Sequence, residues 1–324
     1  MCQSKLGGKT LSKGIKMEFS KKNDSGDTIY HISKLNKSDN GTLNCRYCGT
    51  DVQYVSAYTR GASNTPVAAY LKLWQDAEHS DECGYSVKGA VDLLVAESNS
   101  VEDTNPIFEQ QDDGSYLFRM NILMDAQKVA QDLSKSGKEF EASEHLSSRR
   151  NYIRSEKQLA SYFRSAAGIA KLRALIQESS DVEALKSAIK IQYKDNFVSW
   201  NDFYYDETRY KILFNRLIKG QISHPVAVNI TLKGEVSLYK EAKYFPWSFQ
   251  SYSQTVATNG EKLVYIPRLQ LAKESFTKNI SAGDSLLVVG DVWANKIKDE
   301  SSIFRGFNIS VFNKSQFKKE IESH

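Results

Sequence analysis

The sequence is poor in cysteine and has no long apolar run. No run approaches the roughly 20 residues that cross a bilayer, so we expect neither a membrane span nor a membrane partner. Four cysteines among 324 residues do not make a disulfide scaffold. The basic segment 1–16 is followed by no hydrophobic stretch, which argues against a secretory signal. Together these absences predict a cytoplasmic protein.

The common motifs of catalysis are also missing. The sequence has no GxSxG, no phosphate-binding GxxxxGK loop, no GxGxxG and no HExxH. Asp92 and Glu97 are a candidate carboxylate pair for a divalent metal, but a gap of five residues is common by chance. We therefore predict no catalytic residues, and a metal-dependent nuclease is kept as an alternative.

Composition and patterning predict an α+β protein. Hydrophobic residues make up 40% and charged residues 25% of the chain, as in ordinary globular proteins, which excludes fibrous and wholly disordered classes. The length predicts two or three domains. We expect a flexible tail over 1–16, an α/β module over 17–114, a mainly helical segment over 115–221 and a β domain over 222–324.

Periodicity supports this division. Six apolar residues spaced three and four apart share one face of a helix expected within 146–177, and these are Leu159, Tyr162, Ala166, Ile169, Leu172 and Ile176. Asp181 is expected to cap a following helix that runs through Ile191, and residues 206–219 should form another. After Pro225 the pattern changes to alternation, which predicts at least five strands.

One motif carries strong chemical information. Cys45 and Cys48 form a CxxC followed by Gly49, a knuckle that turns tightly and aims two thiolates at one point. His79 and Cys83 follow, four residues apart, which on a helical turn would place them on one face. We predict a Cys₃His zinc site. Because all four ligands come from the protein, the Zn²⁺ would be structural rather than catalytic. The alternative is a set of reduced structural cysteines beside an exposed histidine.

The arrangement of these residues resembles the zinc-binding N-terminal module of competence CoiA-like proteins. The match covers about 60 residues and rests on the Cys45–Cys48–Gly49 knuckle, the strands that follow it and the His79…Cys83 pair. The family's second histidine, in its HFxH pattern, is absent, since residues 74–78 read WQDAE, and no nuclease signature follows. The resemblance implies a zinc-stabilised module in a protein that handles DNA.

A basic segment follows the first module. Between residues 149 and 173 seven positive charges face one negative charge, and the candidates for phosphate contact are Arg149, Arg150, Arg154 and Lys157. Each contact with a phosphate would add to the salt dependence of binding. The alternative is a solvated helix face that pairs with the acidic loop over 97–114.

The C-terminal β domain looks like an OB-fold, a five-stranded, partly open barrel that binds single strands. The resemblance rests on Gly283–Trp293 and Phe304–Phe312, which are similar to the late strands of single-strand DNA-binding proteins. Cations and aromatic rings, which suit phosphates and stacked bases, are interleaved in this half. The candidate binding residues are Lys240, Lys243, Trp247, Arg268 and Trp293. The alternative is that the rings are simply core.

We therefore predict a zinc-containing protein that binds nucleic acid, with single-stranded DNA favoured. Recombination, DNA uptake and mobile-element or phage processes would suit it. Besides the nuclease, the second alternative is a protein–protein adaptor that docks through the exposed rings of residues 244–252.

Overall fold

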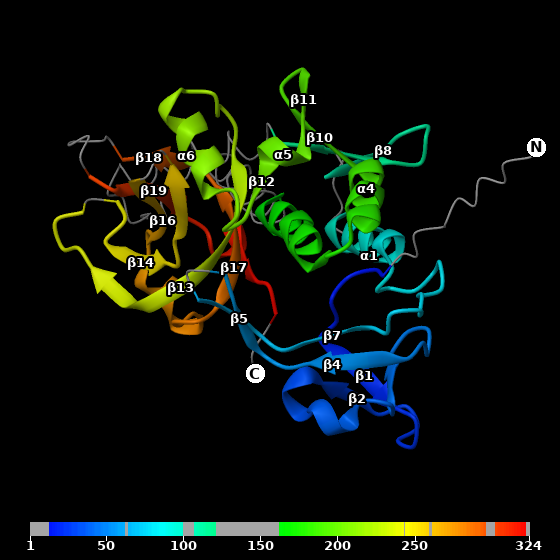
Figure 1. The fold of residues 1–324 in the computed structure, drawn as a ribbon. Helices are drawn as coiled ribbons and strands as arrows, with labels where there is room; N and C mark the ends of the chain where they lie inside the picture. The colour runs from blue at the N-terminus through cyan, green and yellow to red at the C-terminus, as the bar shows by residue number, and fades with distance from the viewer. Residues whose placement is uncertain are drawn as a thin grey trace, which may run out of the picture.

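The computed structural model describes residues 13–61, 64–99, 107–120, 162–242, 244–258, 261–295 and 302–321. It confirms an α+β protein, with short strands in one half and a strongly curled sheet in the other (Figure 1). Among the described residues, no helix is long and apolar enough to cross a membrane. The named helices are α1 (Val87–Asn99), α4 (Ser179–Ala188), α5 (Trp200–Phe203) and α6 (Tyr210–Ile218), with 3-10 turns η1 (Ile32–Lys34), η2 (Lys37–Asp39), η3 (Glu274–Asn279) and η4 (Lys314–Gln316).

The first half is built from short strands. One antiparallel sheet has the order β2-β1-β3, and two hairpin-like pairs are β4 with β7 and β5 with β6. The bounds are β1 Phe19–Lys22, β2 Ile29–His31, β3 Leu43–Cys45, β4 Val52–Val55, β5 Tyr58–Arg60, β6 Thr65–Val67 and β7 Tyr70–Leu73. Three or four residues per strand bury little apolar surface, so this half needs further support.

The middle of the chain is less helical than its pattern predicts. A four-stranded sheet, β11-β10-β9-β8, takes strands from it, with bounds β8 Phe108–Gln110, β9 Tyr116–Arg119, β10 Ile189–Tyr193 and β11 Asn196–Val198. The helix expected to run through Ile191 instead ends at Ala188, because β10 pairs in parallel with β9 from Ile189 onward. That partner lies some 70 residues earlier in the sequence, so local periodicity could not reveal it.

The helix at residues 162–175 lies at the centre of the molecule (Figure 1). Tyr162, Ala166 and Ile169 are buried, as the predicted apolar face requires. Phe163, Ala167 and Ala170 on the other sides are buried too, so the helix is enclosed rather than amphipathic. Small residues allow this, since a Cβ on Gly168 would lie 2.5 Å from Leu94 of α1.

The second half is a nine-stranded sheet that curls on itself. Its order is β18-β19-β16-β14-β13-β17-β20, with β12 beside β13 and β15 beside β16. The bounds are β12 Tyr204–Tyr205, β13 Val226–Leu238, β14 Trp247–Ser251, β15 Gln254–Thr258, β16 Glu261–Leu271, β17 Ser285–Gly290, β18 Val292–Ala294, β19 Phe304–Val311 and β20 Phe317–Lys319. Only Asp291 separates β17 from β18, yet β17 pairs with β13 and β18 with β19. The sheet therefore bends round into a half-barrel whose end is capped by α6.

Two hydrophobic cores meet at β13 and β17. Val226, Val228 and Ile230 face the core inside the curled sheet, together with Leu286 and Val288 of β17. The alternate residues Ala227, Leu287 and Val289 belong instead to the core of the first half. Both faces of β17 and of residues 226–232 of β13 are consequently covered, and the outer side of this part of the sheet is closed to ligands.

The segment 13–16, predicted to belong to the flexible tail, is packed into the structure. Ile15 and Lys16 are each 8% exposed. The Lys16 ammonium pairs with Glu320 near the end of β20 and lies 4.7 Å from the Tyr70 ring centroid. This segment therefore connects the first half to the C-terminal strand of the curled sheet.

Candidate metal centre and outer sheet face

The knuckle begins where β3 ends. Cys45 is the last residue of that strand, and its amide donates to the Thr50 carbonyl over 2.7 Å while its carbonyl accepts from Gly49 N over 2.9 Å. Gly49 has a φ of +74°, a conformation that glycine adopts without steric cost. The turn therefore returns Cys48 to the same side as Cys45, and Gly49 is needed for its backbone conformation rather than for space, since a Cβ there would have no neighbour within 4 Å.

His79 and Cys83 come from the irregular segment between β7 and α1. The expected helical turn is absent, because α1 begins only at Val87. A tight turn takes the place of the helical turn, and in it Cys83 N donates to the Ser80 carbonyl over 3.0 Å. The residues between the ligands thus bring both side chains to the knuckle without a helix.

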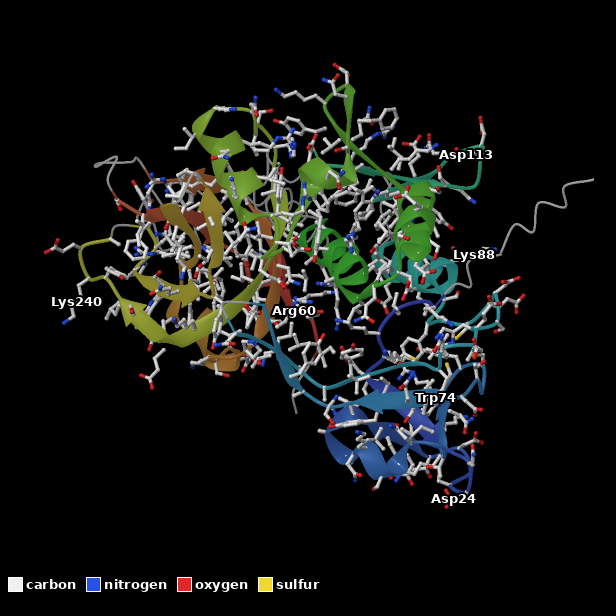
Figure 2. The ribbon with its side chains drawn as sticks, in the orientation of Figure 1. Asp24, Arg60, Trp74, Lys88, Asp113 and Lys240 are labelled. Carbon is white, nitrogen blue, oxygen red and sulfur yellow. The ribbon has the colours of Figure 1, made fainter. Side chains whose placement is uncertain are left out.

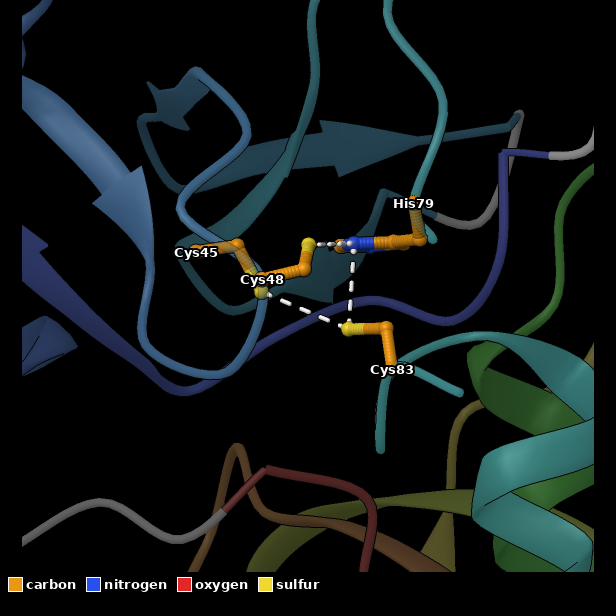
Figure 3. Close-up of side chains that lie close together, drawn as sticks. All are labelled: Cys45, Cys48, His79 and Cys83. Atoms are coloured by element: carbon orange, nitrogen blue, oxygen red, sulfur yellow. Dashed lines mark hydrogen bonds between the residues drawn. The ribbon is translucent and has the colours of Figure 1, made fainter. Parts of the chain in front are cut away.

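The four side chains converge on one point (Figure 3). Cys45 Sγ lies 3.6 Å from Cys83 Sγ, and His79 Nδ1 lies 3.3 Å from Cys48 Sγ and 3.4 Å from Cys83 Sγ. All four ligand atoms lie within 4.8 Å of one another. A tetrahedral site with metal–sulfur bonds of about 2.3 Å and metal–nitrogen bonds of about 2.0–2.1 Å has edges of roughly 3.5–3.8 Å. Cys45, Cys48, His79 and Cys83 therefore lie close enough to hold a metal ion.

The electrostatics of the cluster suit a bound cation. Burial raises the pKa of Cys45 to about 12 and also raises that of Cys83. Burial acts the same way on Cys48, but hydrogen bonds with Thr50 and His79 outweigh it and lower its pKa to about 5. Several buried thiolates repel one another without a counter-charge, and a divalent ion at the centre supplies that charge. The donor set thus fits a thiophilic metal.

Cationic and aromatic side chains pack around the knuckle. The guanidinium of Arg46 lies over the rings of Phe19, Tyr47 and Tyr85, at 4.8, 4.5 and 5.3 Å from their centroids. Tyr85 is buried and follows Cys83 by two residues, and its amide donates to the Cys83 sulfur over 3.4 Å. The ligand-bearing loops are consequently held by aromatic packing on one side.

On the other side they are held by a contact that the sequence did not reveal. The ammonium of Lys13 donates to the carbonyls of Trp74 and Ala77 in the loop before His79, over 3.3 and 3.2 Å. The amides of Lys13 and Gly14 both donate to Asp181 Oδ2, each over 2.9 Å. Asp181 is 1% exposed, so this is a buried anchor in the first turn of α4 rather than the predicted helix cap.

Gly14 fits where no other residue would. Its φ is +68°, and a Cβ there would lie 2.3 Å from the Tyr85 carbonyl oxygen and 2.9 Å from the His79 ring. The segment thus lies directly against a metal ligand. Its anchor Asp181 is 167 residues away, and no short-range pattern signals such a pair.

The curled sheet leaves one outer face open. Strand register places four residues abreast across β14, β16, β19 and β18, and they are Gln250, Arg268, Asn308 and Trp293. Their neighbours along the strands point inward, as the complete burial of Leu269 and Phe307 shows. Arg268 is exposed, and Trp293 is 38% exposed. Cation and ring therefore lie on one surface, as their predicted role requires.

Polar and aromatic contacts fix this row. Asn308 accepts from Gln270 Nε2 over 3.2 Å and donates its own Nδ2 to Asn295 Oδ1 over 2.6 Å. From the connection between β13 and β14, Phe245 packs against Trp293, with ring centroids 6.4 Å apart. The outer face is thus preorganised, with aromatic side chains along one margin.

The other predicted binding residues are placed differently. Trp247 pairs with Leu271 and packs against the core inside the curled sheet, so its ring is not part of the outer face. Lys240 is exposed in the connection after β13, and Figure 2 shows it pointing away from the sheet at its margin. Lys243, Arg149, Arg150, Arg154 and Lys157 lie outside the described residues.

Three other cations of the basic segment are described, and one of them, Arg164, is exposed on the helix 162–175. Lys171 pairs with Glu18 over 2.9 Å, and Arg173 lies 5.1 Å from the Tyr204 ring centroid. Both side chains hold the helix 162–175 against its neighbours. A structural role therefore accounts for this end of the segment.

Comparison with known proteins adds no family. No protein-family model matches the chain, and no curated protein sequence matches it significantly.

Proposed function

We propose that the chain is a zinc-containing protein that binds single-stranded nucleic acid, with DNA favoured, on the outer face of its curled sheet. The sheet is interpreted as an OB-fold. Its strands β13, β14, β16 and β19 follow one another in the order β19-β16-β14-β13, with β17 and β18 as one broken strand that touches both β13 and β19. In a five-stranded, partly open barrel the strands likewise follow one another round until the last lies near the first. Barrels of this kind bind oligonucleotides.

The metal in this proposal is Zn²⁺. Three sulfur ligands and one imidazole at tetrahedral separations are the donor set of structural zinc sites. Four protein ligands leave no open position for a reacting molecule, so the ion's task is to hold the loops 45–50 and 79–85 together. We assign it no catalytic step.

One observation carries the proposal: Arg268 and Trp293, both exposed, lie on the same outer side of the half-barrel, with the buried Asn308 between them in the register. An exposed guanidinium attracts phosphates, and an exposed indole offers a flat surface to a base. The opposite side, at β13 and β17, is covered by the core of the first half. A strand bound to this sheet would therefore lie across β14, β16, β19 and β18.

The test is fluorescence anisotropy of the full, zinc-loaded chain with matched single-stranded and double-stranded oligonucleotides at two salt concentrations. We expect tighter binding of the single strand, weakened by salt. Trp293→Ala should weaken it by about 5- to 150-fold, the equivalent of about 1–3 kcal/mol for one stacked base. Arg268→Ala should weaken it and reduce its salt dependence.

Arg119→Ala is the matched control, because Arg119 is an exposed arginine on β9 of the other half. It should bind as the wild type does. Equal loss in all three variants, or no binding at low salt, would overturn the proposal. Degradation of the labelled strand in Mg²⁺ would favour the nuclease instead, and salt-insensitive capture of a protein would favour the adaptor.

A further inference from the structure

A cavity of about 380 Å³ opens on the outer face of the curled sheet, beside the row that carries the proposed function. Its floor is Gly306 of β19, which lies opposite Ile266 of β16 in the strand register. The outward positions on either side of it carry large side chains, Phe304 and Asn308. Gly306 itself contributes no side chain to the cavity, and the Asn295 side chain lies against it.

The geometry at Gly306 shows how easily the cavity would close. A Cβ built there would lie 2.8 Å from Asn295 Nδ2. Gly306 has no positive φ, so the backbone does not require glycine at this position. Because glycine has no side chain, it leaves room beside the strand. The volume of the cavity lies at the lower end of the roughly 300–1,000 Å³ that small-molecule pockets have.

The apolar walls suit a flat ring. Phe304 is 59% exposed, and Ile266 lies across from it on β16. Phe214, from α6, closes the far end. An exposed phenylalanine beside an aliphatic wall offers stacking to a base that leaves the strand.

The polar side chains of the walls present mainly hydrogen-bond donors, because the Asn295 side-chain oxygen and the Phe304 carbonyl already accept from Asn308 and Arg305. The charged residues that line the cavity are Arg268 and Arg305, and a guanidinium has no acceptor. Asn295 uses its carbonyl oxygen to accept from Asn308, which leaves its Nδ2 group over Gly306. A base edge that only accepts hydrogen bonds matches this wall. Guanine presents O6 and N7, whereas adenine places the N6 donor beside N7.

We propose that this cavity binds one nucleobase of the single strand and prefers guanine over adenine. The inference rests on the proposed function, because it takes the ligand to be a strand that crosses the same face. It adds a base preference to a surface whose other contacts, a cation and a stacking ring, do not distinguish sequences.

The experiment uses three oligonucleotides of equal length: an all-thymine strand, and the same strand with one central guanine or one central adenine. Anisotropy titrations at fixed salt give the ratio of their affinities for the full, zinc-loaded chain. We expect the guanine strand to bind about tenfold more tightly than the adenine strand, the discrimination that one two-point arginine contact supplies.

Two variants test the cavity itself. Gly306→Val fills it and should bring the guanine-to-adenine ratio close to one while binding of the all-thymine strand persists. Asn295→Asp keeps the oxygen that accepts from Asn308 but replaces the donor over Gly306 with an acceptor, so the ratio should shift toward adenine. This second variant remains informative if Gly306→Val does not fold. Arg119→Ala, on β9 of the other half and away from the cavity, is the control and should keep the wild-type ratio.

The outcomes separate the two proposals. Tight, salt-sensitive binding of all three strands with equal affinity would overturn the base preference and leave the proposed function standing. A guanine preference that survives Gly306→Val in a folded protein, with Asn295→Asp also unchanged, would place the preference elsewhere and overturn the cavity. Failure to bind any strand would overturn the proposed function, and the inference with it.

Discussion

The two halves of the molecule achieve order by different means. In the first half the strands have three or four residues, and the ligands sit on turns that cannot hold themselves together. In the second half β13 has 13 residues and β16 has 11, and they enclose a continuous core. Short strands contribute few ladder bonds and little buried area, so we expect the loops 45–50 and 79–85 to depend on the candidate metal site and on contacts distant in sequence, although a hydrophobic core packs beneath them. The second half depends on side-chain packing.

Removal of a metal ligand is the most direct test of this difference between the two halves. Cys83→Ser takes away a buried ligand, and structural zinc contributes about 10–16 kcal/mol in zinc-finger peptides, as much as a whole domain's stability of about 5–15 kcal/mol. We expect loss of bound metal and unfolding of the loops 45–50 and 79–85, with the transition of the curled sheet retained. Calorimetry, metal analysis and limited proteolysis measure these three effects.

Cys2→Ser is the control, because Cys2 is the cysteine that the cluster does not use. It should leave metal content and melting unchanged. Cys83→Ser with wild-type metal content and melting would contradict the assignment of the site.

The converse test removes core volume from the second half. Phe307 is completely buried in the curled sheet, and truncating a buried phenylalanine to alanine costs about 3–5 kcal/mol. Phe307→Ala should lower the denaturation midpoint of the curled sheet without changing the bound metal. Phe197→Ala, at a site that is 70% exposed, should have little effect. Loss of bound metal in Phe307→Ala would show that the stability of the metal site depends on the core of the curled sheet.

A smaller effect should come from the segment under the metal loops. Gly14→Ala adds a methyl group against the Tyr85 carbonyl and the His79 ring, at a positive φ. Strain of this kind costs about 1–3 kcal/mol, and here it should also weaken metal binding in competition with a chelator. Gly26→Ala has the same backbone strain at a φ of +60° but no neighbour within 4 Å. Equal metal affinity in the two variants would remove the proposed contact.

The smallest effect should lie where the halves meet. Asp202 of α5 pairs with Arg216 of α6, and the hydrogen bond from Arg216 lowers the pKa of Asp202. Because the folded pKa is lowered, the stabilisation is present above the unfolded value and is lost as the pH falls below about 4. Asp202→Asn should cost about 0.2–1 kcal/mol at pH 7, the range for partly exposed pairs, and progressively less toward pH 3. Urea denaturation across this range tests it, and a difference that does not vary with pH would contradict it.

Local chemistry made the metal centre predictable. The ligand residue types and the CxxC turn can be recognised from residues close together in the sequence. Cys45, Cys48, His79 and Cys83 could therefore be identified without the structure. The support of that centre could not be selected, since the anchor from Asp181 to Gly14 joins residues 167 apart. The same limit applies to residues 189–193, since the parallel pairing of β10 with β9 joins residues some 70 apart, although its antiparallel pairing with β11 is local.

Alternation made the strands of the second half predictable, but not the side on which each ring lies. Trp247 begins β14 and Trp293 is the middle residue of β18, and composition treats them alike. Register separates them, because Trp247 lies opposite Leu271 of the core and Trp293 opposite Asn308 of the outer face. Which face of a sheet is solvated is decided by what covers it, and that requires the whole fold.

The burial of β13 and β17 on both faces bears on how the protein can be divided for study. A fragment that begins at residue 222, where the sequence pattern changes, would carry the whole half-barrel but expose Ala227, Leu287 and Val289 to water. Those side chains would form an exposed aliphatic patch, and such a patch favours self-association. In hydrogen exchange the amides of these two strands should therefore be among the slowest in the intact chain, and a truncated barrel should lose that protection even if its own interior remains folded.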